Sequence, residues 1–113
     1  MTTGPPVANF TLSEDHADGG AVTVHAVGEI DLATSPQLRE LLHRLVAAGS
    51  RRVVLDLSET SFIDSSGLGV LVGVLRATRE GGDDRSFVLS GLQDQVRKVF
   101  EITGLDQVFT IEG

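Results

Sequence analysis

The chain contains no cysteine, tryptophan or tyrosine, and its aromatic residues are five phenylalanines. Without cysteine it has neither a disulfide framework nor a thiolate metal site. Basic residues are also scarce: nine lysines and arginines stand against 16 aspartates and glutamates, which gives a formal net charge of -7. Such a charge opposes approach to a phosphate backbone, so we expect no direct binding of nucleic acid.

A long apolar run is also missing. The longest stretch without a polar side chain runs from Gly67 to Leu75, far short of the roughly 20 residues that span a bilayer. No basic segment precedes an apolar run at the N-terminus, so a signal peptide is not expected. We therefore expect a soluble cytoplasmic protein with no membrane association. At 113 residues the chain suits one domain, predicted over residues 7–113 after a flexible tail over residues 1–6.

Hydrophobic patterns predict an alternation of strands and helices. Strands are expected at residues 7–12, 21–30, 53–57, 87–89 and 108–111, and helices between Thr34 and Gly49, over 65–80 and from Leu92 to Thr103. The acidic stretch 14–20 predicts the turn of an antiparallel hairpin. The strand 53–57 is almost continuously apolar, which is typical of a strand covered on both faces. The order predicts a single-domain α/β fold with a mixed, mainly parallel sheet, an N-terminal antiparallel hairpin and three to four helices.

The carboxyl ends of parallel strands meet at one edge of a sheet, beside the N-termini of the helices. Asp31, the segment after the strand 53–57, and Ser90 are therefore expected there. Asp64, Ser65 and Ser66 precede the central helix, and one of them should cap its free N–H groups. For the helix before it, Thr34 and Gln37 have the spacing of a capping box.

Glycines in the central helix require an explanation, because each costs about 1 kcal/mol relative to alanine in a helix interior. Gly69 and Gly73 form a smooth stripe with Ala77 at a spacing of four. The bulky residues expected to face the core are Leu68, Leu71, Val72 and Leu75. Val70 and Val74 then remain on flanks that a small domain cannot cover. We interpret the glycine stripe with these two valines as the apolar part of a protein-binding surface.

Ser65 has three chemical interpretations. The plainest is a helix cap, which the residues alone favour. A phosphorylated serine is the second, since a helix N-terminus accommodates negative charge. A nucleophilic serine fits less well, because the hydrolase elbow requires glycine where Ile63 stands. We expect each histidine to be solvated or hydrogen-bonded: His16 in the acidic turn, His25 in the second strand and His43 on the polar side of the first helix.

The acidic residues Asp31, Asp56, Glu59 and Asp64 form a conceivable metal cluster. However, Asp64 competes for the helix cap, Asp56 is expected to point outward from its strand, and Glu59 is assigned to a loop. We find no ligand pattern beyond acidity. The sequence therefore predicts neither a metal site nor a cofactor.

A set of segments in fixed order carries a family resemblance. They are Gly28-Glu29-Ile30-Asp31, Val53 to Leu57, Phe62 to Gly69, Gly81-Gly82, Val96 to Phe100 and Thr103-Gly104-Leu105. From about Ala21 to the C-terminus, these segments resemble the STAS domain of bacterial anti-sigma factor antagonists. The specific part is Asp-Ser-Ser-Gly-Leu-Gly at 64–69, whereas the first strand and the acidic turn carry no recognisable signature.

The resemblance implies a partner switch. In such proteins the unphosphorylated antagonist binds an anti-sigma factor that is also a serine kinase, and the sigma factor is released. The kinase phosphorylates the serine after the aspartate, which corresponds to Ser65, and a metal-dependent serine phosphatase reverses the modification. We therefore predict a monomeric, non-enzymatic regulator of transcription with no catalytic residue. The predicted partner-binding residues are Asp31, Asp64, Ser66, Gly67, Gly69, Val70, Gly73 and Val74.

Two alternatives remain at this point. A STAS scaffold subunit that binds its partner constitutively would use Ser65 only as a cap. A serine or metal-dependent hydrolase ranks far lower, and it would require turnover of a generic ester that Ser65→Ala abolishes.

Overall fold

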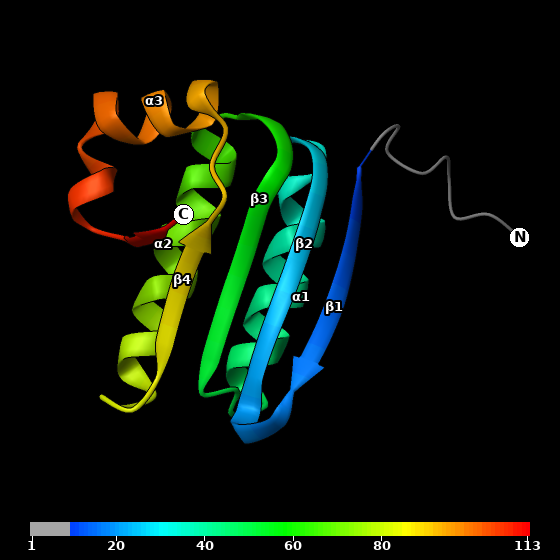
Figure 1. Ribbon diagram of the computed structural model, residues 1–113, viewed down its shortest axis with the longest axis vertical. Helices are drawn as coiled ribbons and strands as arrows, with labels where there is room; N and C mark the ends of the chain where they lie inside the picture. Colours follow the sequence, from blue (N-terminus) through cyan, green and yellow to red (C-terminus); the bar gives the residue numbers. More distant parts are fainter. Residues whose placement is uncertain (1–9) are drawn as a thin grey trace, which may run out of the picture.

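The computed structural model describes residues 10–113 (Figure 1). The tail expected over residues 1–6 lies outside this range, as does the start of the first predicted strand at Val7. The strands are β1 (Thr11–Ala17), β2 (Ala21–Ile30), β3 (Arg52–Ile63), β4 (Ser86–Ser90) and β5 (Thr110–Glu112). The helices are α1 (Ser35–Ala47), α2 (Ser65–Glu80) and α3 (Asp94–Thr103), with short 3-10 turns η1 (Asp18–Gly20) and η2 (Leu105–Gln107).

The strands form one five-stranded sheet in the order β1-β2-β3-β4-β5. β1 pairs antiparallel with β2, and every later pair is parallel. The predicted mixed, mainly parallel sheet with an N-terminal hairpin is thus confirmed.

Two helices, α1 and α2, cover one face of the sheet (Figure 1). The core lies between these layers, where Val24, Leu55, Leu42 and Leu71 are fully buried. Along β2 and most of β3, buried residues alternate with partly exposed ones. The prediction that strand 53–57 is covered on both faces is therefore wrong, because its second face is only partly covered.

β1 differs from its prediction. It begins at Thr11 and continues through the acidic segment to Ala17, so that the turn contains only Asp18–Gly20. His16 lies in this strand opposite Val22, not in a turn. Charged side chains at these positions suit an exposed edge strand, which they protect from pairing with another chain.

β3 is much longer than predicted and includes Glu59, which was assigned to a loop. Its pairing with β2 shifts register on both sides of the segment from Val27 to Gly28, and Gly28 has a positive φ of 117°. The buried Thr60 hydroxyl donates to the Ala26 carbonyl oxygen at 2.7 Å. This bond gives the Ala26 carbonyl a partner where the ladder is irregular, and a buried carbonyl without a partner costs free energy.

The start of α1 is also different from the capping box predicted at Thr34. The Thr34 hydroxyl accepts from the Asp31 amide and donates to the Glu29 carbonyl oxygen, both at 2.8 Å. Asp31 Oδ1 in turn accepts from the Ala33 and Thr34 amides at 2.9 and 3.0 Å. These bonds shape the turn between β2 and α1, since an aspartate binds its own backbone readily in turns. Thr34 therefore closes a loop and makes no side-chain bond to α1.

The C-terminal elements agree with the predictions, apart from their exact ends. Gly104 ends α3 in the left-handed conformation with φ 76°. The Phe109 ring packs edge-on against Phe100 at 5.8 Å and against Phe87 at 6.3 Å between centroids. These contacts hold η2 and β5 against the sheet. Of the helices within residues 10–113, none is long and apolar enough to cross a membrane.

A histidine lies between two carboxylates on the partly covered face of the sheet. His25 Nδ1 is 2.8 Å from Asp56 Oδ2, and Nε2 is 2.7 Å from Asp15 Oδ2. The Asp56 carboxylate, followed by that of Asp15, raises the pKa of His25. Burial alone would raise the pKa of Asp56, but hydrogen bonds from Ser58 and His25 lower it below its usual value. The cluster joins β1, β2 and β3.

These shifts predict a pH dependence of stability. The His25 contribution is complete below its unfolded pKa of about 6.5 and is lost as pH rises through the raised folded pKa. The Asp56 contribution is present above its unfolded pKa and is lost as pH falls through the lowered folded pKa. We expect the free energy of unfolding of wild type to exceed that of His25→Gln most at about pH 5.5 to 6. Urea unfolding across pH measures this difference, and a difference that stays constant up to pH 9 would contradict the prediction.

Candidate functional site

The turn from β3 into α2 is the centre of the candidate site. Asp64 has an extended backbone, and its Oδ1 accepts from the amides of Ser66 at 2.9 Å and Gly67 at 3.3 Å. The prediction that one of three residues caps this helix is confirmed, and the cap is Asp64. Ser65 is the first residue of α2 and its side chain is exposed. Within residues 10–113, no hydrogen bond involves the Ser65 hydroxyl, so the cap does not need it.

The end of β2 lies beside this turn. The Asp64 amide donates to the Ile30 carbonyl oxygen at 3.1 Å, and Ile30 pairs with Ile63 in the parallel ladder. Asp31 and Asp64 thus follow neighbouring strand ends, as the sheet-edge argument predicted. Ser90 does not join them, because β3 extends six residues past Leu57 while Ser90 pairs with Asp56.

Three of the residues predicted to bind a partner lie in the interior. Val70 and Val74 are 3% and 0% exposed, so their placement on an exposed flank is wrong. Gly67 is buried too, and a Cβ there would lie 2.5 Å from Ile30 Cγ2 and 2.8 Å from Ile63 Cγ1. Periodicity assigned only one face of α2 to the core. In the structure α2 packs against both α1 and the sheet, so a wider arc of the helix is buried.

The glycine stripe has two different environments. Gly69 is exposed, and a Cβ there would meet nothing within 4 Å. At Gly73, which is half-buried, a Cβ would lie 3.8 Å from His43 Nε2. His43 therefore faces α2, not the polar side of α1 as expected. Of the stripe, Gly69 offers open surface next to the Ser65 turn, and Gly73 lies where the two helices meet.

Sequence reasoning missed two apolar side chains at this edge. Leu32, in the turn after β2, is 77% exposed, and Phe62, near the end of β3, is 46% exposed. Phe62 pairs with Glu29, next to the Ile30–Ile63 pair, and Leu32 follows Ile30 by two residues. Leu32 and Phe62 therefore lie at the same edge of the sheet as the Ser65 turn. A signal existed for Leu32, because it is a large apolar residue in a loop between two regular elements.

The acidic residues considered as a metal cluster each have a separate structural role. Asp64 caps α2 and Asp31 shapes the turn before α1. Asp56 contacts His25 and accepts from the Ser58 amide at 2.9 Å. In the part of the chain that the structure describes, no three histidine, cysteine or acidic residues group in a way that could hold a metal ion.

The cap geometry predicts different effects at two adjacent residues. Asp64→Ala removes the acceptor for two first-turn amides and should lower the free energy of unfolding by about 1 kcal/mol. Ser65→Ala should change it by only a few tenths of a kcal/mol, as is usual for exposed positions. Urea unfolding of both variants, with Asp64→Asn as a capping control, measures this. A larger loss in Ser65→Ala than in Asp64→Ala would contradict the assignment of the cap.

Comparison with known proteins gives consistent matches to one family. The model of the STAS domain family matches residues 14–113. The anti-sigma-B factor antagonist of Listeria monocytogenes is 34% identical over 105 residues, which cover 93% of this chain and 90% of that protein. The protein of the same name from Staphylococcus aureus is 36% identical over 84 residues, covering 74% and 76%.

Solved structures agree with this match. The crystal structure of an anti-sigma factor antagonist from Mycobacterium paratuberculosis has a TM-score of 0.80 to this chain at 29% identity. The alignment covers 91% of this chain and 85% of that one. The similarity therefore extends over almost the whole described fold, including the turn that leads into α2.

Proposed function

Because this chain belongs to the STAS domain family, we propose that it is an anti-sigma factor antagonist controlled by phosphorylation of Ser65. The unphosphorylated protein binds an anti-sigma factor that is also a serine kinase, and the sigma factor is released. The protein itself is a regulator and catalyses no reaction. Its relatives from Listeria and Staphylococcus, named anti-sigma-B factor antagonists, support this role.

The observation that carries the proposal is the position of Ser65. Its side chain is exposed at the first residue of α2, while the Asp64 carboxylate alone caps the helix. A kinase can therefore transfer the γ-phosphoryl group of ATP to the Ser65 oxygen without breaking a bond that the fold needs. ADP leaves and the hydroxyl proton is released. A metal-dependent serine phosphatase then reverses the step by hydrolysis to serine and inorganic phosphate.

Charge supplies the switch. A phosphoryl group adds about -1.5 to -2 charge at neutral pH, and the partial positive charge of a helix N-terminus tolerates it. The domain therefore stays folded. The same charge lies beside the carboxylates of Asp64 and Asp31, on an edge that a partner has to desolvate. Repulsion and desolvation at this edge are sufficient to release the partner.

The surface that contacts the anti-sigma factor consists of residues around the Ser65 turn that are exposed or partly exposed. We assign to it Asp31, Ser66 and Gly69 of the predicted set, and add Leu32 and Phe62, whose exposed apolar side chains are typical of a protein-binding surface. Gly67, Val70 and Val74 are left out because they are buried. Asp64 contributes as the cap that holds Ser65 in place.

Mass spectrometry of the protein from its own cells tests the proposal. We expect a phosphate on Ser65 in a fraction of molecules, located in the peptide that spans Asp64 to Gly67. Ser65→Ala, used as bait, should retain a serine kinase that binds a sigma factor. A peptide free of phosphate under all growth conditions would contradict the switch and favour the constitutive scaffold.

A further inference from the structure

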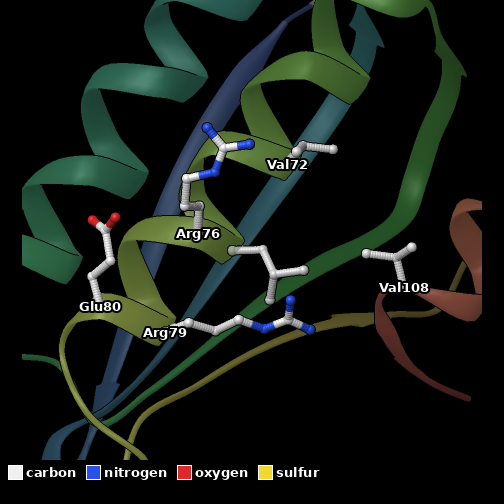
Figure 2. Close-up of a pocket in the computed structure, with 6 residues that line it drawn as sticks. Val72, Arg76, Arg79, Glu80 and Val108 are labelled. Carbon is white, nitrogen blue, oxygen red and sulfur yellow. The ribbon is translucent and has the colours of Figure 1, made fainter.

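A groove opens along the C-terminal half of α2, away from the Ser65 turn. It has a volume of about 300 Å³ and is lined by Val72, Leu75, Arg76, Arg79, Glu80 and Val108. Figure 2 shows Arg79 extending toward Val108, and Glu80 lining the groove farther from Val108 than Arg76 does. The groove thus has an apolar floor, and two guanidinium groups and the Glu80 carboxylate lie at its margin.

The groove carries two basic side chains, those of Arg76 and Arg79. Both are exposed, and among residues 10–113 neither forms an ion pair, although Arg44 and Arg52 do. Most of the chain's nine lysines and arginines likewise form no ion pair among these residues, so what distinguishes these two is their position beside an apolar floor. Two unpaired guanidiniums beside an apolar floor complement a carboxylate that is next to an apolar side chain.

The groove and the Ser65 turn lie on the same face of α2. Ser65, Gly69, Val72, Arg76 and Arg79 are spaced four, three, four and three residues apart, which places them on one face of a helix. Four of them are exposed and Val72 is half-buried. The rise of an α-helix separates Ser65 from Arg76 by about 16 Å. A standard interface of about 800 Å² per partner easily spans this length.

We propose that an acidic segment of the anti-sigma factor, with an apolar residue beside its carboxylate, docks in this groove. The apolar side chain contacts Val72, Leu75 and Val108, and the carboxylate binds Arg76 and Arg79. This contact gives the partner a second point of attachment on α2, remote from the phosphorylated serine. The inference rests on the proposed function, because it names how the same partner binds.

The test measures affinity for the anti-sigma factor that Ser65→Ala captures, produced as a purified protein. All variants carry Ser65→Ala, so phosphorylation does not interfere. Arg76→Glu/Arg79→Glu should weaken binding about tenfold or more at low salt, and the difference should shrink at high salt because the charges are exposed. Val108→Asp should weaken binding as well, since it places a charge on the apolar floor.

The matched control is Arg51→Glu/Lys98→Glu. It changes the net charge equally at two exposed residues outside α2, and it should leave the affinity within about twofold. If both double variants lost the same affinity, the change in net charge would explain the loss, and the inference would be overturned. Unchanged affinity in Arg76→Glu/Arg79→Glu would overturn it while leaving the proposed function intact.

Two other outcomes also contradict the proposal. If dodecanoate bound to the groove, and the double reversal abolished that binding without affecting the anti-sigma factor, the groove would be a site for small anionic amphiphiles. If no anti-sigma factor bound to Ser65→Ala at all, the proposed function and the groove assignment would fail together. The first result would contradict docking in the groove but not the proposed function, whereas the second would contradict both.

Discussion

Ser65→Asp will bind the anti-sigma factor about 100-fold more weakly than wild type, whereas Ser65→Ala will bind normally and cannot be switched off. The aspartate adds a fixed negative charge on an edge that already carries the carboxylates of Asp64 and Asp31. A 100-fold loss corresponds to about 2.7 kcal/mol, which is in the range for an unpaired charge at an interface. Titration calorimetry with purified proteins measures both variants.

The control for this prediction is Ser13→Asp. Ser13 is exposed on β1, opposite His25 in the antiparallel ladder, so it lies on the face of the sheet away from α2. The added charge is the same, and the affinity should stay unchanged. If Ser65→Asp bound as tightly as Ser13→Asp at physiological salt, repulsion at the Ser65 turn would not be the mechanism of release.

Gly67→Ala will lower the free energy of unfolding by about 2 kcal/mol. Its Cβ would lie 2.5 Å from Ile30 Cγ2 and 2.8 Å from Ile63 Cγ1, closer than carbon atoms approach in folded proteins. Either α2 moves away from the sheet or the two isoleucines change position, and such overpacking typically costs about 1 to 3 kcal/mol. Urea unfolding followed by circular dichroism measures the loss.

Gly69→Ala is the matched variant two residues along the same helix. A Cβ there meets nothing within 4 Å, and alanine is favoured over glycine in a helix by about 1 kcal/mol. The free energy of unfolding should therefore rise. A loss of stability in Gly69→Ala, or an unchanged stability in Gly67→Ala, would contradict the packing of α2 on the sheet.

Much of the fold could be predicted because its signals are local. The start of α2 follows from the capping residues at 64–66, its end from Gly81-Gly82, and the end of α3 from Gly104, where each signal coincides with the limit of an apolar pattern. The parallel sheet follows from the alternation of elements. The position of Ser65 at a helix N-terminus follows from the same arguments. Phosphorylation was one of three interpretations that the residues allowed, and only the family resemblance favoured it over a simple helix cap.

The errors concern features that tertiary packing decides. Val70 and Val74 are buried because α1 covers the flank that periodicity left open, and the sequence alone does not show where a neighbouring helix lies. The capping box predicted at Thr34 does not form, because the Thr34 hydroxyl accepts from the Asp31 amide in the turn before α1 and makes no bond to the helix. β3 was predicted too short because polar residues after Leu57 resemble a loop, although Thr60 is buried in the ladder.

The most direct measurement compares the affinity of one purified preparation for its anti-sigma factor before and after phosphorylation of Ser65. The kinase and ATP produce the modified protein, mass spectrometry verifies the site, and calorimetry gives the dissociation constants with a nonhydrolysable nucleotide present. We predict tight binding before modification, a loss of at least about 100-fold after it, and full recovery after treatment with a serine phosphatase. Equal affinities for the two forms would contradict a switch at Ser65.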